Sequence, residues 1–261
     1  MSDSSKPLPP APPSDEAVLR EAARRSRRAF ILGGAAALAG LGGWRWLVTR
    51  PEADHLAWPL RRVLDANGQL AEEYFSNAHL APVFPVGRAK APRVNGKVGL
   101  KTALDPAAWR LRVQREAAPG QVAHRQELTL ADIQALPRVE MTTELKCIEG
   151  WSTVVHWAGA RFADFVGRYA PGAALPYVSL ATPDGLYYVG LDLPSALHPQ
   201  TLLCYEMNGQ PLTAEHGAPL RLVTPVKYGI KYIKRIGSIA FLTQRPADYW
   251  AVRGYDWNAG H

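Results

Sequence analysis

The residue with the clearest chemical potential in this sequence is Cys147, one of only two cysteines. It lies just past a strand-like run, beside Gly150 and Trp151. A thiolate placed there can ligate a soft or high-valent metal, and a metal-bound thiol is deprotonated. The cation of Lys146 would favour the thiolate form. Cys147 is therefore a candidate metal ligand and catalytic residue.

A second group of candidates lies on either side of a Gly-Ala-Pro turn, where His216 and Arg221 are five positions apart. A loop with this spacing can present a ring donor and a guanidinium to one ligand. The planar guanidinium suits a phosphate because it bonds its oxygens in pairs. Taken alone, the two residues would fit a surface turn with a structural ion pair better than a ligand site.

A lysine-rich segment follows Pro225 and runs from Tyr228 to Lys234. Taken alone, it would fit a strand edge blunted by lysines. Thr182, which follows the strand-like run at residues 177 to 181, would alone be an ordinary strand-end threonine. Neither feature identifies a ligand without the other segments.

Together these segments resemble the molybdopterin-binding domain of the sulfite oxidase family. The resemblance rests on residues 144–152, 208–221 and 229–234 and extends over roughly residues 70 to 257. It implies a Mo-molybdopterin cofactor, with Cys147 as the protein ligand to molybdenum. The family's pterin-contacting positions fall on Thr182, His216, Arg221, Tyr232, Ile233 and Lys234.

Two further segments extend the resemblance. Phe75 to His79 matches a pattern of aromatic-x-Arg-Asn-His, so Phe75, Asn77 and His79 are further expected cofactor contacts. Asn77 stands where sulfite oxidases carry an arginine that binds sulfite. Losing that cation removes about 1.5–3 kcal/mol of charge-assisted hydrogen bonding, which argues against sulfite as the substrate. Tyr255, thirty-four residues after Arg221, matches the active-site tyrosine and is a second catalytic candidate.

The resemblance implies a two-electron oxygen-atom transfer on a small substrate. A single exported domain is also similar to the catalytic subunit of the periplasmic methionine sulfoxide reductase system, although that group has asparagine at the position of His216. Sulfite oxidase proper and protein-methionine-sulfoxide reductase both stay open. The chain has no Cys-x-x-Cys-His motif and no iron–sulfur cysteine set, so a separate haem protein, either a soluble cytochrome or a membrane cytochrome b, is the expected electron partner.

Two readings from other classes compete with a molybdenum enzyme. One is a cofactor-free periplasmic binding or scaffold module of the same fold. The other is a thiol redox protein that uses Cys147 and Cys204, which would require their sulfurs to come within bonding distance. Cys204 lies in an apolar run from Leu202 to Tyr205, where a small buried hydrophobe is the default interpretation.

The first fifty residues differ from the rest and predict an export signal or anchor. A proline-rich tail from Pro7 to Pro13 precedes a paired arginine, Arg27-Arg28, and an apolar run from residue 32 to 41, as in twin-arginine signals. Residues 30–48 are long enough to span about 30 Å of membrane as a helix. The expected organisation is a leader over residues 1–50 and one oxidoreductase domain over residues 51–261 that faces the periplasm.

Composition and pattern predict an α+β domain built on mixed or antiparallel sheets with few helices. The sequence has 22 prolines and 22 glycines between short strand-like runs. Strands are expected at residues 109–113, 177–181, 186–193, 220–223 and 238–242, with a hairpin turn at Asp184-Gly185. Helices are expected at residues 129–136, with a capping box, and at 163–169. Residues 51–95 are expected to be mostly loop, with one helical turn at residues 70–74.

The charge pattern gives little support to nucleic-acid binding. Of the formal net charge of +7, residues 1–50 supply +4, from eight Lys/Arg against four Asp/Glu, which leaves +3 for the rest. We find no Lys/Arg-rich run interleaved with aromatic residues in the domain, which a nucleic-acid groove would need. Nucleotide-binding glycine motifs are absent as well.

Overall fold

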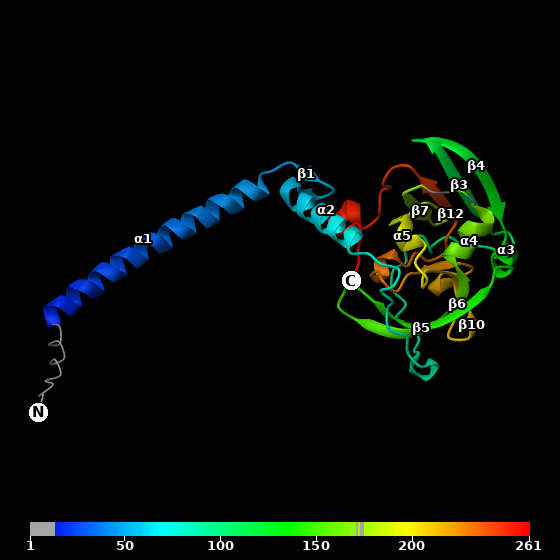
Figure 1. Cartoon of the computed structure of the whole chain (residues 1–261), viewed down its shortest axis with the longest axis horizontal. Helices are drawn as coiled ribbons and strands as arrows, with labels where there is room; N and C mark the ends of the chain where they lie inside the picture. The colour runs from blue at the N-terminus through cyan, green and yellow to red at the C-terminus, as the bar shows by residue number, and fades with distance from the viewer. Residues whose placement is uncertain (1–13, 171, 173–174) are drawn as a thin grey trace, which may run out of the picture. The chain divides into compact units, whose positions relative to one another are not determined.

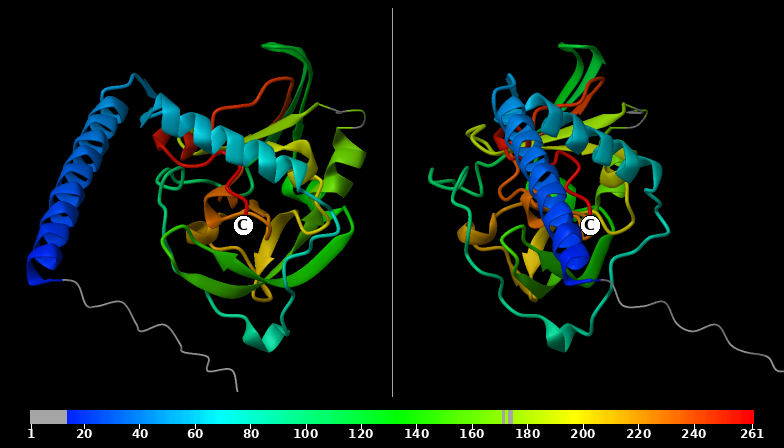
Figure 2. Two further views of the ribbon diagram at one scale, coloured as in Figure 1. Left: turned by 60° about the vertical axis from the view of Figure 1, so that its left-hand side comes forward. Right: turned by 90° about the vertical axis from the view of Figure 1, so that its left-hand side faces the viewer.

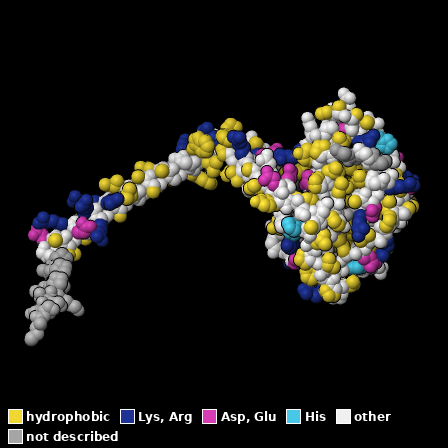
Figure 3. Space-filling view, in the orientation of Figure 1, with side chains coloured by type: hydrophobic (Ala, Val, Ile, Leu, Met, Phe, Trp, Pro, Cys, Tyr) yellow, Lys and Arg dark blue, Asp and Glu magenta, His cyan; other side chains and the backbone are white. Residues whose placement is uncertain are grey.

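The computed structural model describes residues 14–170, 172 and 175–261, and the chain forms two compact units, Met1–Pro51 and Glu52–His261. In the first unit, helix α1 (Asp15–Val48) starts at Ser14, whose side chain accepts a hydrogen bond from the Ala17 amide. By length and composition α1 is apolar enough to cross a membrane, a test that a signal sequence near the N-terminus also passes. Figure 3 shows charged side chains gathered towards the N-terminal end of this helix. The prediction for Pro7 to Pro13 lies outside the described residues.

The second unit contains two five-stranded sheets and a small hairpin (Figure 1). One sheet is antiparallel and has the order β10 (Gln210–Pro211), β9 (Leu202–Met207), β6 (Ser152–Arg161), β5 (Arg138–Lys146), with β11 (Arg221–Val223) also paired to β9. The other has the order β4 (Gln121–Leu128), β3 (Leu111–Ala118), β12 (Ser238–Leu242), β7 (Tyr177–Ala181), β8 (Tyr188–Asp192). It is mixed, because β12 runs parallel to β3. The hairpin pairs β1 (Glu52–Ala53) with β2 (Leu56–Ala57).

The helices of this unit are short apart from α2. They are α2 (Trp58–Glu73), α3 (Leu130–Gln134), α4 (Phe162–Tyr169) and α5 (Leu193–Ala196), with 3-10 turns η1 (Val86–Arg88), η2 (Ala214–His216), η3 (Gly229–Lys231) and η4 (Ala251–Arg253). The capping box of α3 forms as predicted, because Thr129 and Asp132 each bond the other's backbone amide. The sheets and few helices confirm the predicted α+β class.

Two hydrophobic cores hold the sheets in place. The larger core contains Trp109, Phe162, Phe165 and Phe241 among its buried members. The smaller core packs the antiparallel sheet against the turn that follows η3, and its buried members are Met141, Leu145, Val155, Trp157, Leu202, Cys204, Val223 and Tyr232. Cys204 is fully buried, as its apolar surroundings in the sequence predict. Both cysteines are free thiols, and no disulfide joins them.

Helix α2 corrects the expectation of a loop with a single helical turn at residues 70–74. Pro59 stands in its first turn, where a missing amide hydrogen does no harm. The buried residue of α2 is Arg61 rather than an apolar side chain, so the usual amphipathic signal is weak. The Arg61 guanidinium donates to the backbone carbonyl oxygens of Asp54, Ala251 and Tyr255. Contacts distant in sequence therefore stabilise this helix.

All five expected strands form, and those at 177–181 and 238–242 have the predicted bounds as β7 and β12. The other three differ at their ends. The expected strand at 109–113 is β3, which begins at Leu111 and continues to Ala118. The expected strand at 186–193 is shortened to Tyr188–Asp192, because the turn at Asp184-Gly185 takes its first residues and the Asp192 side chain caps α5. The expected strand at 220–223 is β11.

A test of the β6–β9 packing is the substitution Gly159→Ala. A Cβ at Gly159 would lie 2.1 Å from the Leu203 carbonyl oxygen, so the two strands would have to separate. We expect a loss of about 1–3 kcal/mol in the free energy of unfolding, measured by urea denaturation. The matched control is Gly167→Ala in α4, where a Cβ meets no atom within 4 Å and helix propensity should make the change neutral or stabilising. Equal effects of the two substitutions would contradict this packing.

Candidate active site

Cys147 begins the five-residue loop that joins β5 to β6. The strand register ends at the pair Lys146 and Ser152, and the loop then closes through a hydrogen bond of 2.9 Å from the Cys147 amide to the Trp151 carbonyl oxygen. Gly150 supplies the left-handed backbone that this turn requires, with φ of 84°. The loop thus fixes the thiol at one place, where it is half-buried. Burial raises the pKa of the Cys147 thiol.

The Cys147 side chain lines a cavity of about 210 Å³. Six residues predicted from the sequence share its wall: Cys147, His216, Arg221, Tyr232, Lys234 and Tyr255. Residues that the sequence analysis did not assign to a ligand site complete much of it, among them Arg93, Asn95, Trp151, Trp157, Tyr187 and Trp250. The sequence therefore predicts the separated segments that meet here, although it does not identify every contributor.

The His216 loop and the Lys234 segment pack closely side by side. The Arg235 amide donates to the Gly217 carbonyl oxygen at 3.1 Å, and the Ile236 amide donates to the Leu220 carbonyl oxygen at 2.9 Å. Gly217 has φ of 99°, and a Cβ there would lie 2.7 Å from the Lys234 Cβ. Only glycine allows this approach, which places the two basic segments on one wall.

The cations of this wall face one another without a carboxylate partner. The Arg221 guanidinium is buried over the Trp157 ring at 4.8 Å and donates to the His216 carbonyl oxygen at 3.0 Å. Burial lowers the pKa of Arg221. Burial, then repulsion by Arg221, lowers the pKa of Lys234 to about 8, and burial with repulsion by Lys234 and Arg221 lowers that of His216. Within the described part of the chain, no ion pair involves these three residues. Such a wall favours an anionic ligand.

Unpartnered polar atoms gather on the same wall. Among the described residues, six buried side-chain polar atoms have no hydrogen-bond partner, and four belong to residues lining this cavity. These four are His216 Nδ1, Arg221 Nε, the Tyr232 hydroxyl and Trp157 Nε1. Leaving a buried polar group without a partner costs about 1–3 kcal/mol, so their concentration here indicates a polar ligand.

Tyr187 is a cavity residue that the sequence analysis missed. Its hydroxyl donates to the Ile230 carbonyl oxygen at 2.6 Å and accepts from the Trp250 indole at 3.1 Å. Burial raises the pKa of Tyr187, so it remains a neutral donor. Nothing around Tyr187 in the sequence distinguishes it from a strand residue after a turn. Trp250 in turn contacts Tyr255 edge to face, with ring centroids 5.1 Å apart, and Tyr255 is 41% exposed at the cavity mouth.

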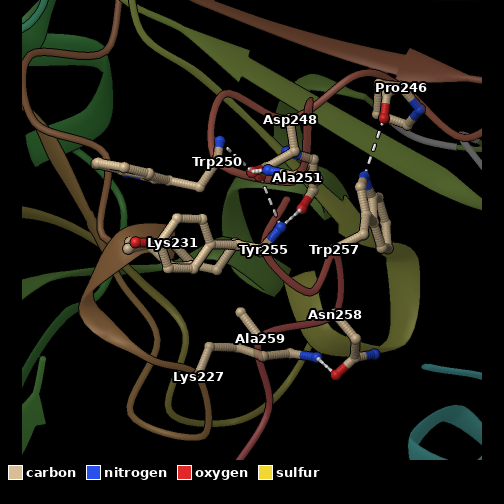
Figure 4. A network of polar contacts seen from close by, with 12 residues as sticks. Lys227, Lys231, Pro246, Asp248, Trp250, Ala251, Tyr255, Trp257, Asn258 and Ala259 are labelled. Carbon is tan, nitrogen blue, oxygen red and sulfur yellow. Dashed lines mark hydrogen bonds and ion pairs between the residues drawn. The ribbon is translucent and has the colours of Figure 1, made fainter. Parts of the chain in front are cut away.

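A buried ion pair anchors this aromatic side of the cavity (Figure 4). Lys231 and Asp248 are almost inaccessible and lie 2.7 Å apart. The Asp248 carboxylate also accepts from the backbone amides of Gly190, Trp250 and Ala251. The pair thus joins η3 and β8 to the segment that carries Trp250 and Tyr255.

Five predicted contacts lie outside this cavity wall. Ile233 is fully buried in the larger core. The Thr182 hydroxyl donates to Asp184 at 2.6 Å and so holds the turn before Tyr187. The Phe75 ring packs on His198, and Asn77 is exposed.

His79, the fifth of these predicted contacts, lines a neighbouring pocket with Lys146 and His261. Its segment is held away from the cavity because the His198 ring bonds the His79 carbonyl oxygen and Gln200 bonds both backbone groups of Ala81. Residues 92–98 form the cavity wall instead.

Comparison with known proteins identifies the family. Residues 97–250 match the model of the oxidoreductase molybdopterin binding domain. The putative protein-methionine-sulfoxide reductase subunit YedZ1 of Azospira oryzae is 34% identical over 189 residues, which cover 71% of this chain and 70% of that protein. The protein-methionine-sulfoxide reductase catalytic subunit MsrP of Xanthomonas campestris is 35% identical over 162 residues, 56% of this chain and 49% of that protein. The chain thus spans about half the length of that catalytic subunit.

A solved structure shares the fold. The sulfane dehydrogenase SoxCD from Paracoccus pantotrophus superimposes with a TM-score of 0.50 and 16% identity, covering 65% of this chain and 46% of that chain. The wall described above fits a molybdopterin cofactor, because its cations and unpartnered donors suit the anionic pterin phosphate while the Cys147 thiol suits the metal.

The buried ion pair can be tested by a double-mutant cycle. Asp248→Asn leaves the Lys231 ammonium buried without a counter-charge, so we expect a loss of about 3–5 kcal/mol in the free energy of unfolding, measured in urea. Adding Lys231→Met removes that charge and should restore part of the loss. If Asp248→Asn prevents folding, recovery of soluble protein in the double variant would also show that the unpaired Lys231 charge causes the loss. No recovery would show that the pair does not act as a unit.

The cofactor-binding wall can be tested with Lys234→Gln. Removing this cation should weaken retention of molybdopterin by about 1.5–3 kcal/mol, or roughly ten- to 150-fold in affinity, because a charge-assisted contact is lost. The measurement is pterin fluorescence of protein purified from a host that makes the cofactor, with the exposed Lys101→Gln as control. The Lys234 ammonium also donates to the Asn95 and Glu215 carbonyl oxygens, so thermal unfolding of the cofactor-free variant separates lost binding from lost structure. Unchanged pterin content would exclude Lys234 from the binding wall.

Proposed function

Because the chain belongs to the oxidoreductase molybdopterin-binding family, and is therefore a molybdopterin-dependent oxidoreductase, we propose that it transfers an oxygen atom from a sulfoxide. The balanced reaction takes one sulfoxide, two electrons and two protons to one thioether and one water. The observation that carries the proposal is the Cys147 thiol on the wall of a cavity that His216, Arg221 and Lys234 make basic. The names of the relatives, protein-methionine-sulfoxide reductase subunits, support the sulfoxide class.

Each part of the cavity has a role in this proposal. Bound molybdopterin supplies a metal centre that exchanges one oxygen atom and two electrons. Cys147 is the protein ligand to molybdenum. His216, Arg221, Tyr232 and Lys234 hold the organic part through their cations and unpartnered donors. Thr182 holds the turn that carries Tyr187, and Ile233 anchors the Lys234 segment in the larger core.

The aromatic side of the cavity orients the substrate. Trp250 is fixed by its indole bond to Tyr187, and its ring contacts Tyr255 at the mouth. The Tyr255 phenol is exposed and free to donate a hydrogen bond to a sulfoxide oxygen, which develops negative charge as its bond to sulfur breaks. An apolar aromatic surround suits the alkyl groups of a thioether product.

Sulfite oxidation is the second candidate, and one observation favours it. Arg93 lines the cavity and stacks over the Trp151 ring at 5.6 Å, so a guanidinium is available to an anion even though Asn77 replaces the arginine expected from the family pattern. In that reaction the electrons would pass from the substrate to the partner protein, because sulfite and water give sulfate, two electrons and two protons. Sulfoxide reduction remains the primary proposal because the sequence relatives bear that name.

We further propose that the domain is exported to the periplasm and exchanges electrons with a separate haem protein. The paired arginines and the apolar length of α1 support export or membrane anchoring through residues 30–48. The two cysteines of the chain are too few for a cysteine-bound iron–sulfur cluster, which supports an external electron carrier.

The decisive experiment compares Cys147→Ser with Cys204→Ala. Protein purified from a cofactor-competent host should contain about one molybdenum and reduce methionine sulfoxide with a reduced dye as donor. Cys147→Ser should lose at least a thousandfold in kcat, because the hydroxyl replaces the metal's thiolate ligand. Cys204→Ala should keep its activity, since that thiol lies in the core, outside the cavity wall, and its sulfur bonds the Glu206 carbonyl oxygen.

The outcomes also separate the alternatives. Loss of activity in both variants would favour a thiol redox protein, and wild-type protein without metal or pterin would favour a cofactor-free scaffold module. Rapid sulfite oxidation with a dye acceptor, together with no sulfoxide reduction, would replace the primary proposal with the second candidate. A fully active Cys147→Ser variant is the result that would exclude metal ligation as the basis of the activity.

A further inference from the structure

Residues 86–101 form a basic strap, which carries five Lys/Arg and no Asp or Glu. The five are Arg88, Lys90, Arg93, Lys97 and Lys101, and all are exposed. No ion pair of the described residues involves any of them. Cations grouped without counter-charges produce a positive potential that extends into solvent. Neither the fold nor the cofactor wall explains this concentration of charge.

The basic strap passes from the edge of the antiparallel sheet to the cavity mouth. The Phe84 amide just before it bonds the Thr142 carbonyl oxygen, and the Lys90 amide bonds the Val154 carbonyl oxygen at 2.8 Å, so β5 and β6 hold its first half. Its second half contributes Arg93, Asn95 and Val98 to the cavity wall. Figure 2 shows this segment, in blue-green, as a long excursion with one short turn, η1. The charge therefore lies beside the entrance to Cys147.

An apolar centre accompanies the basic rim. Val94, Val98 and Tyr255 are 47%, 38% and 41% exposed, and the last two line the cavity mouth. One acid, Glu149, also lines the cavity, and its carboxylate is bonded by the Trp151 indole. Exposed apolar side chains within a charged rim are the composition of a transient protein interface.

We propose that the basic strap is the docking surface for the electron-donating haem protein, and that this partner carries an acidic face around its haem edge. This inference rests on the proposed function. Each sulfoxide requires two successive one-electron transfers, so two haem irons pass from Fe(II) to Fe(III) while one sulfoxide and two protons become one thioether and one water. The basic strap and Cys147 line the same cavity, so a carrier docked on the strap would bring its haem edge close to the proposed metal ligand.

Charge complementarity defines what this partner must look like. Long-range attraction to an acidic face raises association rates about ten- to a thousandfold and falls steeply with ionic strength. Small interfaces suit carriers that must dissociate after every electron. An anionic membrane surface would also be attracted to the strap, but it cannot deliver electrons, so it is an outcome to be excluded by the test.

The test uses holo-protein with Lys90→Gln, Lys97→Gln and Lys101→Gln combined. The matched control combines Arg112→Gln, Arg125→Gln and Arg168→Gln, which removes the same charge from exposed residues of β3, β4 and α4, elements that contribute no residue to the cavity wall. The donors are a reduced haem protein with an acidic face, one with a basic face and similar potential, and a small neutral dye. Haem oxidation with excess methionine sulfoxide is followed as ionic strength is raised.

We expect the strap variant to lose about tenfold or more in kcat/KM for the acidic haem protein at low ionic strength, and to lose most of its salt dependence. Its rate with the dye should stay within twofold of wild type, as should every rate of the control variant. The basic haem protein should react slowly with wild type. Equal loss in the strap and control variants, or equal rates with acidic and basic donors, would overturn the proposal.

Two readouts keep this proposal separate from the proposed function. If wild type fails to reduce sulfoxide even with the dye, the proposed function fails, and direct binding of the acidic haem protein, measured by calorimetry at low and high salt, still tests the strap. Strap-dependent, salt-sensitive binding would support the docking surface, and its absence would overturn it. Vesicles containing anionic lipid are the remaining arm: strap-dependent binding to vesicles without any effect on the haem protein would assign the surface to a membrane instead.

Discussion

The structure depends on keeping three basic groups close together without a carboxylate between them. Backbone carbonyl oxygens and a tryptophan ring orient Arg221 and Lys234 without neutralising them, while His216 Nδ1 has no partner. Burial lowers the pKa of all three groups, and repulsion by neighbouring cations lowers those of His216 and Lys234 further. An anionic ligand bound to this wall would offset the repulsion between the basic groups. Cofactor binding should therefore raise the stability of the folded protein. Gly217 allows the His216 loop and the Lys234 segment to pack side by side, and the loop from Cys147 to Trp151 places the thiol on the wall of the same cavity.

Much of the site was predictable because its chemistry depends on residue type and local spacing. The Cys147 turn, the His216 to Arg221 loop and the segment ending at Lys234 each carry their own signal, and the structure brings them to one cavity. The Phe75 to His79 segment carries a pattern too, but its position is decided by His198 and Gln200, more than a hundred residues away in sequence. Tyr187 and Asn95 lack any local signal. Their roles arise only from packing, which one sequence without relatives does not reveal.

The fold shows the same division between local and distant causes. The capping box of α3 and the turn at Asp184-Gly185 are short-range features, and both form as expected. Helix α2 escaped the sequence analysis because its buried face is made by an arginine that bonds carbonyl oxygens from both ends of the domain. A buried charge inverts the hydrophobic pattern on which helix prediction rests. The expected strand at 186–193 ends one residue early for a related reason. The Asp192 side chain caps α5, and this contact ends the strand before the apolar run does.

The guanidinium of Arg61 has a consequence for access to the cavity. It ties helix α2 to the carbonyl groups of Ala251 and Tyr255, which are about 190 residues away in sequence. Tyr255 and its neighbour Trp250 line the cavity, so this part of the mouth takes its final position only when α2 has docked. Before α2 docks, a bulky prosthetic group has a wider route inwards, and docking then holds the mouth in place around it.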